Sequence, residues 1–361
     1  MNNLACRMPK SAPTGWGRCG NEISWRMKYK EVDVREAEMR MEMATVANVV
    51  LSPVSDHRFQ YTTSELGVKN VGYGFIENNI YAKNLAYYGD RLWDHIACGS
   101  TWMREWLKEM VKIDTSVVIQ GVNPAEFYYK ETLSEDFTVG SFGKFEFRKS
   151  QDLVIAAFAI FQKMHPDVNL VYNWNNPWPD LIRKFAWNKH TAIRMHYSLE
   201  DQFYAQNQRG LYAAMLEDKG IKNSLNVHGY REDTSYRACD VILFPNRCEA
   251  GTNLCLMEAL ACGVPCIVTD ATGHTDITRN PDYPCSDLLL TCGKPKIFTQ
   301  GDSILGEWHE PCLDEIVSKL EQAYRQRDDL RRRRKAISEF GTKFTWTETT
   351  DKLYEIMNSY L

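Results

Sequence analysis

The sequence predicts an α/β protein of two domains, each built around a parallel β-sheet. Three observations predict this fold class. The chain has 361 residues, which is more than a single hydrophobic core usually serves. Short β-branched runs alternate with helical stretches, a pattern that is typical of βαβ units. The alternation starts afresh near Phe137, so two such units are expected to follow one another along the chain.

The first half of the chain contains the expected elements of one sheet and its helices. A turn rich in small residues at 11–20 leads into a predicted helix at 21–30, and a charged patch at 31–42 is also predicted to be helical. Ser100 is expected to cap a helix at 101–111, because a serine side chain can accept from free backbone N–H groups. Strands are predicted at 46–51, 68–76 and 117–119. The stretch 87–98 is predicted to be a helix that leads into a short strand.

The second half repeats this pattern with more strongly apolar segments. The apolar stretch Gln151–Met164 is predicted to be a helix, and the polar loop 143–150 precedes it. Strands are predicted at 137–142, 169–172, 225–227, Val241–Phe244 and Cys266–Thr269, and further helices at 235–239, Leu254–Ala261, 315–335 and 347–360. The basic run at 331–335 is interpreted as the solvated face of a helix rather than as a phosphate site.

Composition and charge are those of an ordinary soluble enzyme. A net charge of −4 gives no general reason to expect nucleic acid or an anionic membrane as a partner. The 11 cysteines include no Cys-x-x-Cys pair, which is typical of free thiols in a reducing compartment. The N-terminal segment lacks the apolar run of a signal peptide, and no stretch approaches the ~18 apolar residues that cross a bilayer. We therefore expect a cytoplasmic protein without a transmembrane segment, for which peripheral contact with a membrane stays open.

The clearest chemical signal is a strand, a loop and a helix near residue 250. The strand Val241–Phe244 is expected to end at the carboxyl edge of a parallel sheet, where open α/β folds bind ligands. The sequence GTN at 251–253 then opens the helix Leu254–Ala261, whose unpaired N–H groups favour an anion such as a diphosphate. Glu258 lies one turn into this helix, from where a carboxylate can accept hydrogen bonds from the hydroxyls of a ribose.

This segment resembles the signature of retaining glycosyltransferases of family 4, the group 1 glycosyl transferases. Their fold is GT-B, in which two Rossmann-like domains have parallel sheets that face each other across a cleft. The signature has a proline, a glutamate, a glycine-rich turn, a second glutamate and Ala-x-Ala-x-Gly-x-Pro. The matching residues here are Pro245, Glu249, Gly251, Glu258, Ala259, Ala261, Gly263 and Pro265.

The spacing of the two glutamates departs from the family. Eight residues separate Glu249 from Glu258, whereas the family usually has seven, so Ala250 takes the position of the first glutamate. The resemblance therefore implies Glu258 as the ribose ligand, and Glu249 is carried as a candidate for the donor sugar. The implied donor-binding set is Gly15, Gly17, Arg148, His228, Tyr230, Glu249, Gly251, Thr252, Asn253, Leu254 and Glu258.

A second resemblance lies upstream, in the sequence SFGKFEFRKSQDLV. The family has Gly-Arg there and a lysine five residues after the arginine, and both cations grip the diphosphate of the donor. Lys144 and Lys149 occupy these positions here, and Arg148 is a further candidate. Lysine keeps the positive charge of arginine but loses its bidentate geometry.

The N-terminal half resembles the family more faintly. The sequence PTGWG at 13–17 is similar to the glycine-rich first loop that faces donor and acceptor. In the second half, His228 and Tyr230 lie in a stretch similar to the one that holds the base. Related enzymes place a polar group of the first domain near the sugar, for which His57, Glu77 and His95 are the candidates. His274, which follows the strand Cys266–Thr269, is also expected to face the cleft. The resemblance implies an acceptor domain over 1–135, a nucleotide-sugar donor domain over 136–342, and a closing helix at 343–361 that crosses back to the first domain.

The function implied is that of a retaining hexosyltransferase that uses a UDP- or GDP-sugar. Lys144, Lys149 and the backbone amides at 251–253 would meet the charge that develops on the leaving diphosphate. The chain has no Asp-x-Asp motif and no His/Asp cluster with ligand spacing, so we expect neither a metal nor a cofactor besides the donor.

The acceptor is expected to carry a hydroxyl group, on a glycan, a lipid-linked sugar or another molecule. A hydroxylated base of viral DNA also fits, and this is the one way in which nucleic acid would be a partner. The alternative hypothesis is a catalytically inactive nucleotide-sugar-binding or scaffold protein of the same fold. Release of sugar from the donor to water would distinguish the two.

Overall fold

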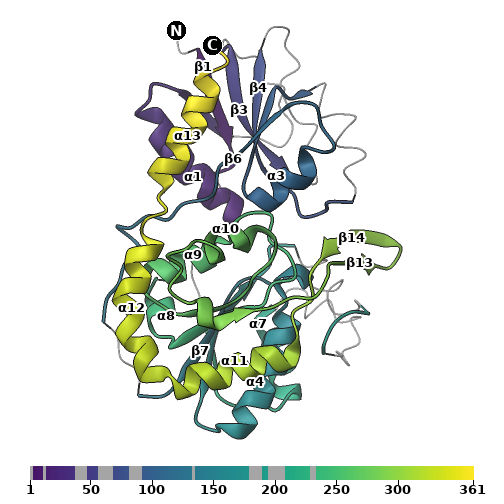
Figure 1. Ribbon diagram of the computed structural model, residues 1–361, viewed down its shortest axis with the longest axis vertical. Helices are drawn as coiled ribbons and strands as arrows, with labels where there is room; N and C mark the ends of the chain where they lie inside the picture. Colours follow the sequence, from purple (N-terminus) through teal and green to yellow (C-terminus); the bar gives the residue numbers. More distant parts are fainter. Residues whose placement is uncertain are drawn as a thin grey trace.

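The structure is a computed structural model in which two α/β units are stacked along the long axis (Figure 1). It describes residues 3–10, 14–36, 47–55, 68–80, 92–131, 135–178, 189–193, 208–227 and 233–361. No helix among these residues is long and apolar enough to cross a membrane.

The first domain is built on a parallel six-stranded sheet with the strand order β2-β1-β3-β4-β5-β6. Its strands are β1 (Leu4–Met8), β2 (Asp33–Glu36), β3 (Val49–Ser55), β4 (Lys69–Phe75), β5 (His95–Cys98) and β6 (Asp114–Val117). Its helices are α1 (Gly15–Lys28) and α3 (Thr101–Leu107). As predicted, Ser100 caps α3, since its side chain accepts from the backbone N–H of Met103.

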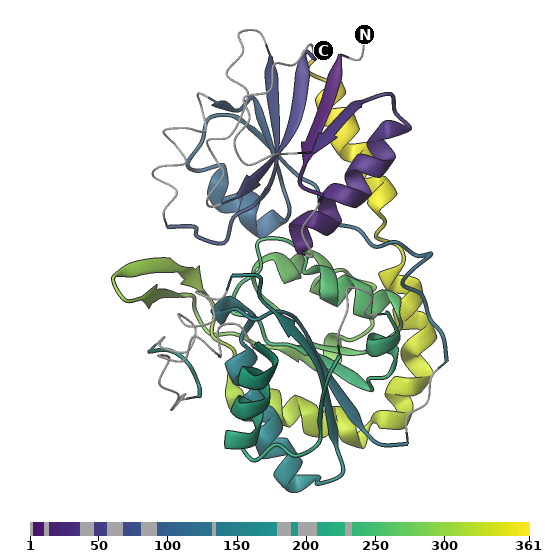
Figure 2. The ribbon, with the colours of Figure 1, turned by 180° about the vertical axis from the view of Figure 1, so that it is seen from behind.

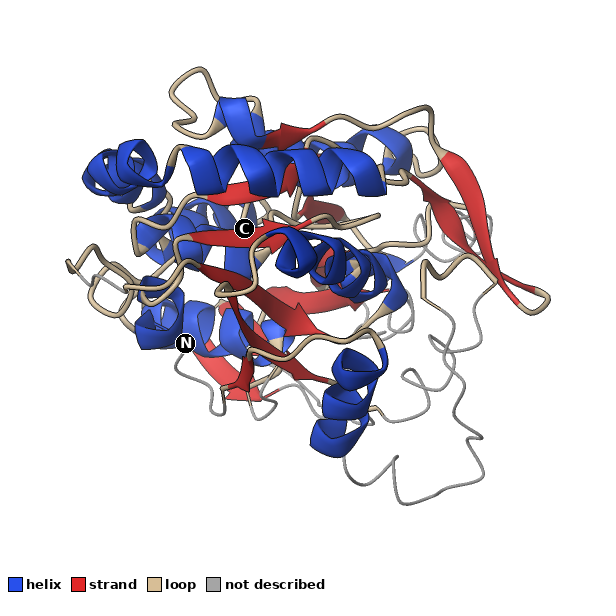
Figure 3. Ribbon diagram, turned by 90° about the horizontal axis from the view of Figure 1, so that it is seen from below, coloured by secondary structure: helices blue, strands red, loops and turns tan. Residues whose placement is uncertain are grey.

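The second domain is built on another parallel six-stranded sheet, with the order β12-β11-β10-β7-β8-β9. Its strands are β7 (Thr138–Lys144), β8 (Asn169–Asn175), β9 (Ser224–Asn226), β10 (Val241–Phe244), β11 (Cys266–Thr269) and β12 (Leu289–Leu290). Its helices are α4 (Gln151–Met164), α7 (Gln208–Asp218), α8 (Asp233–Arg237), α9 (Leu254–Ala261), α10 (Thr275–Thr278), α11 (Leu313–Arg325) and α12 (Arg327–Gly341). Short 3₁₀ turns are η1 (Phe147–Lys149), η2 (Thr272–His274) and η3 (Ser286–Leu288). Helices cover both sides of the strands (Figure 3), so the predicted α/β class with parallel sheets is confirmed.

The last helix, α13 (Trp346–Asn358), returns to the first domain and packs against α1 (Figure 1). Its N-terminus is a capping box, in which Thr345 accepts from the backbone N–H of Glu348 and Glu348 accepts from that of Thr345. The side chains of Trp346, Leu353 and Met357 are buried in the same hydrophobic core as β1 and α1. The first domain is therefore completed by the end of the described chain.

A two-stranded antiparallel hairpin, β13 (Lys296–Gln300) and β14 (Ser303–Trp308), projects from the second domain beside the first (Figures 1 and 2). It contacts the segment that follows strand β4. The indole N–H of Trp308 donates to the backbone carbonyl of Glu77 at 2.9 Å, and the backbone N–H of Glu307 donates to the Asn79 side chain at 2.8 Å. The sequence patterns did not predict this hairpin.

Four predicted elements differ most from those observed. The helix predicted at 21–30 begins at Gly15, because the Thr14 side chain caps it by accepting from the Gly17 N–H. The patch predicted to be helical at 31–42 contains strand β2, which pairs with β1. The helix predicted at 315–335 is two helices, separated at Gln326. The strand predicted at 117–119 lies at Asp114–Val117.

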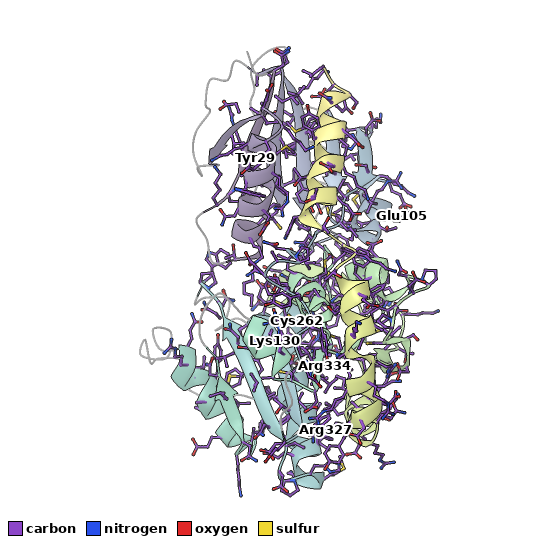
Figure 4. All side chains as sticks on the ribbon, turned by 90° about the vertical axis from the view of Figure 1, so that its left-hand side faces the viewer. Tyr29, Glu105, Lys130, Cys262, Arg327 and Arg334 are labelled. Carbon is purple, nitrogen blue, oxygen red and sulfur yellow. The ribbon has the colours of Figure 1, made fainter. Side chains whose placement is uncertain are left out.

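Side chains of the basic run at 331–335 hold α12 against the rest of the second domain; Arg334 is labelled in Figure 4. Arg334 is buried and donates to the backbone carbonyl of Arg237 at 3.0 Å. Arg331 pairs with the buried carboxylate of Asp240 at 3.0 Å. The interpretation of this run as a solvated face is therefore wrong for Arg334, because the helix also packs against α9 with this side.

Candidate functional site

The candidate site lies where strand β10 ends and helix α9 begins. Glu249, Gly251, Thr252 and Asn253 are all buried in the loop between them. Asn253 has φ 67° and ψ 99°, and its side chain does not cap α9. The hydroxyl of Thr252 donates to the sulfur of Met257 at 2.8 Å. The first N–H groups of α9 thus donate no hydrogen bond to the N-cap side chain, which is the property expected of an anion-binding helix start.

Glu249 lies among the cations that the sequence predicts for a diphosphate. Its carboxylate forms ion pairs with Lys149 and with Arg148, the latter at 3.1 Å, and it also accepts from the Asn246 amide. Burial would raise the pKa of Glu249, but Lys149 and Arg148 outweigh it and lower the pKa to about 2. The carboxylate is therefore charged and partly neutralises the two cations.

Arg148 connects this cluster to the first domain. Its guanidinium contacts three carboxylates, those of Glu77 at 3.3 Å, Glu146 at 3.0 Å and Glu249 at 3.1 Å. Burial lowers the pKa of Arg148, but the three carboxylates raise it well above its usual value. The structure thus brings Glu77, which follows strand β4 of the other sheet, to the predicted diphosphate cations.

Lys144 is placed differently from Lys149. It is the last residue of β7, and its ammonium pairs with Glu146 at 2.5 Å and lies 4.7 Å from the centre of the half-exposed Trp178 ring. Its side chain is 28% exposed, against 12% for Lys149. Lys144 therefore lies at the rim of the cluster, and Lys149 lies within it.

Glu258 has a different environment from Glu249. Its carboxylate pairs with Arg18 of α1 and accepts from the Tyr236 hydroxyl at 3.1 Å. Burial raises the pKa of Glu258, and Arg18 and Tyr236 only partly offset this effect. Glu249, which lies in the loop beside two cations, is therefore the more acidic glutamate, and Glu258, which lies on α9, is the less acidic one.

The first domain contacts the loop directly. A Cβ added to Gly15 would lie 3.7 Å from the Leu254 side chain, and the Ser100 hydroxyl donates to the backbone carbonyl of Ala250 at 2.6 Å. The backbone N–H of Thr101 donates to Asp276 at 2.7 Å, so a carboxylate of the second domain stabilises the N-terminus of α3. These contacts join the two domains around the β10–α9 loop.

Some predicted residues lie elsewhere or outside the described residues. His95 begins strand β5, where its ring contacts the hydroxyls of Ser116 and Tyr360 and not the β10–α9 loop. Gly17 belongs to the first turn of α1, where its N–H donates to Thr14. Gly15 lies in the same turn, opposite Leu254. His57, His228 and Tyr230 lie outside the residues that the structure describes. Within the described ranges, no group of three or more His, Cys, Asp and Glu side chains is arranged to hold a metal ion.

Arg18 and Arg247 contact the site and were not predicted, whereas His274 was expected to face the cleft but was given no role. Arg18 reaches Glu258 from the other domain, and no local pattern identifies it. Arg247 is completely buried beneath η1, where it pairs with Asp152 at 2.8 Å. His274 lies in η2, directly after strand β11. Its place after a parallel strand is where ligands bind in such sheets, and its Nε2 atom lies 3.2 Å from the Asn253 amide of the β10–α9 loop.

Lowering the pH from about 6.5 to about 4 is expected to destabilise the protein through His274. Burial lowers the pKa of this imidazole from 6.5 to about 4, although the Glu249 carboxylate raises it. Between these values the unfolded chain binds a proton that the folded chain does not, so stability falls as the pH falls. The loss is on the order of 3 kcal/mol, from 1.36 kcal/mol per pKa unit.

Urea unfolding at a series of pH values, compared with the H274N variant, measures this contribution. The wild type should lose more stability than H274N between about pH 6.5 and about pH 4. Above about pH 6.5 this contribution is independent of pH. Equal pH dependence of the two proteins would contradict the prediction.

Known proteins resemble this chain both in part of its sequence and in its fold. Residues 204–300 match the family model described as Glycosyl transferases group 1. No curated protein sequence matches the chain. The fold is similar to that of sucrose-phosphate synthase from Thermosynechococcus elongatus, with 15% identity and a TM-score of 0.59 over 87% of this chain and 73% of that chain.

Two other solved structures align over nearly the whole chain. A glycosyltransferase from Rickettsia africae covers 99% of this chain and 98% of its own, with 12% identity and a TM-score of 0.61. HepE from Anabaena, in complex with UDP, covers 99% and 100%, with 11% identity and a TM-score of 0.62.

Proposed function

We propose that this chain, which has the GT-B fold and matches the group 1 glycosyl transferases over residues 204–300, is a retaining glycosyltransferase that needs no metal. The donor is a UDP- or GDP-linked hexose, and no cofactor takes part. The observation that carries the proposal is the buried loop between β10 and α9, which faces Lys149 and Arg148 and is contacted by the first domain.

The leaving diphosphate would be stabilised by groups that are already in place. The N–H groups at the start of α9 provide fixed donors, and Lys149 and Arg148 provide positive charge. Preorganised donors and cations aimed at developing charge supply the largest contribution to most such reactions. Lys144 at the rim would contribute less. The departing phosphate would take the proton of the acceptor hydroxyl on the same face, so that no separate base is needed.

The two glutamates would hold different parts of the donor. Glu258 would accept from the ribose hydroxyls, and for this its carboxylate must exchange part of its contact with Arg18. Glu249, charged and close to Lys149 and Arg148, would face the diphosphate end and the sugar. Glu77 belongs to the first domain and pairs with Arg148 of the second, and it would lie on the acceptor side.

Support for UDP as the nucleotide comes from a protein of similar fold. HepE from Anabaena has been solved in complex with UDP, and also with UDP and glucose. The acceptor would be a hydroxyl group on a glycan, a lipid-linked sugar or another molecule, including a hydroxylated base of viral DNA.

Binding of nucleotide sugars by the wild type and the variant E258A tests the proposal. The wild type at a hundredfold excess of ligand over its dissociation constant should gain about 2.7 kcal/mol of stability in a thermal-shift assay. We expect about tenfold weaker binding by E258A, because hydrogen bonds from the ribose to a charged group are lost. The variant E22A, which removes a carboxylate that pairs with Arg26 of the same helix, is the control. Unchanged binding by E258A, or no binding by the wild type, would contradict the proposal.

The second candidate is a catalytically inactive protein that binds nucleotide sugars. The observation in its favour is that Glu249 pairs with both Lys149 and Arg148, so the cations are partly neutralised. An active enzyme transfers some sugar to water, whereas a protein that only binds the donor releases none. Donor hydrolysis by the wild type distinguishes the two functions.

A further inference from the structure

We propose that His274 is a positioning residue that holds Asn253, and with it the start of α9, in the conformation that receives the donor diphosphate. The inference rests on the proposed function, since it concerns the same loop. It is carried by the contacts of the turn η2, which lies against the loop between β10 and α9.

Three hydrogen bonds connect η2 to this loop. The backbone N–H of Glu249 donates to the Thr272 hydroxyl at 3.0 Å, and the backbone N–H of Gly273 donates to the Glu249 carbonyl at 2.9 Å. The Asn253 amide and the Nε2 atom of His274 are 3.2 Å apart. A Cβ added to Gly273 would lie 2.1 Å from the backbone oxygen of Gly251, so the two segments are in close backbone contact. The turn η2 thus braces the loop at both its ends.

The direction of the His274 bond follows from its other partner. The Nδ1 atom lies 3.0 Å from the backbone carbonyl of Thr269, which can only accept, so Nδ1 carries the proton. The imidazole is buried and neutral, so Nε2 is left as an acceptor and the Asn253 amide donates to it. The charged groups that act on the ring are Glu249, Lys149 and Asp270.

Asn253 needs such a partner because its backbone conformation is unfavourable. A residue other than glycine is strained at φ 67° and ψ 99° and keeps this conformation only where its surroundings hold it. An asparagine at an N-cap usually hydrogen-bonds the first turn of its own helix, whereas here the side chain is directed to His274. The same bond therefore holds the strained backbone and keeps the Asn253 side chain directed away from the first turn of α9.

Two substitutions of His274 separate its two hydrogen bonds. In H274N the amide nitrogen can take the place of Nδ1 and donate to Thr269, but the acceptor for Asn253 is lost. In H274Q the amide oxygen can take the place of Nε2 and accept from Asn253. We expect about tenfold weaker binding of UDP-glucose or GDP-mannose by H274N, and binding within about threefold of the wild type by H274Q.

A second measurement follows the loop without a ligand. Hydrogen exchange at the amides of Leu254 and Cys255 should be faster in H274N than in the wild type and close to the wild type in H274Q. The variant H165N, which changes a histidine that contacts Glu321 on the far side of the second domain, is the control for both measurements.

The variant N253D provides a readout that a merely structural role would not change. An ionised aspartate cannot donate to Nε2, so the contact with His274 forms only when the imidazole takes up a second proton. The added carboxylate raises the pKa of this imidazole above the value of about 4 that it has beside Asn253. Binding of UDP-glucose by N253D should therefore strengthen as the pH is lowered from about 8 to about 6. Binding by the wild type should stay constant over this range.

The outcomes distinguish the two proposals. If the wild type binds no nucleotide sugar, the proposed function is wrong and this inference is wrong with it. If the wild type binds but H274N and H274Q bind equally well, only the inference is overturned. The same holds if N253D shows no dependence on pH.

Discussion

Replacing Arg247 by alanine is expected to lower the free energy of unfolding by about 3–5 kcal/mol. The guanidinium is fully buried and pairs with both carboxylate oxygens of Asp152 at 2.8 Å, and with Glu310 at 2.8 Å. It also lies 4.1 Å from the centre of the Phe147 ring. Without the arginine, the equally buried Asp152 carboxylate would lose its charged partner, which is the costly outcome for a buried ion pair.

Urea unfolding monitored by tryptophan fluorescence measures this loss. The double variant R247M/D152L should recover part of the stability, because no unpaired charge remains in the core. The control is R332A, whose side chain is 73% exposed and 3.4 Å from Asp329, and it should stay within about 0.5 kcal/mol of the wild type. If R247A lost less than about 1 kcal/mol of its free energy of unfolding, the buried ion pair of Arg247 with Asp152 would not stabilise the protein as expected.

Replacing Lys149 by alanine is expected to slow sugar transfer by about 10²–10³-fold, if the proposed function is right. The ammonium is largely buried beside Glu249, at the point where charge would develop on the leaving diphosphate. K149R keeps the charge and should be impaired less. K144A should be impaired by less than about tenfold, because Lys144 lies at the rim and pairs with Glu146.

Release of free sugar from UDP-glucose or GDP-mannose measures these rates before the acceptor is identified. Circular dichroism and melting temperature establish that each variant is folded. The order of effects is the critical result. If K144A transfers sugar as slowly as K149A, the prediction is wrong, and Lys144 contacts the diphosphate during the reaction instead of staying at the rim of the cluster.

The segments that were predicted with the correct bounds are apolar ones. Gln151–Met164, Val241–Phe244, Leu254–Ala261 and Cys266–Thr269 are observed as predicted, because most residues of each are buried and apolar. Strand β2, with the sequence DVRE, could not be predicted in this way. It is a strand because it pairs with β1, which is a partner distant in sequence.

The candidate site was predictable where it follows the strand–loop–helix pattern. The positions of Lys149, Glu249 and Glu258 at one sheet edge follow from that pattern, although their roles stay predictions. The contacts of Glu77 and Arg18 could not be derived, since each joins two domains and leaves no mark in the local sequence. The ion pairing of Glu249 was also not predictable, because it depends on how the loop folds over η2.

The return of α13 to the first domain has a consequence for the order of folding during synthesis. Trp346, Leu353 and Met357 complete the core that begins with Leu4, so the ribosome must translate nearly the whole described chain before this core can close. All elements of the second domain up to α12 have been translated before α13. We expect the second domain to become protease-resistant first on stalled nascent chains, in the reverse of the usual N-terminal-first order.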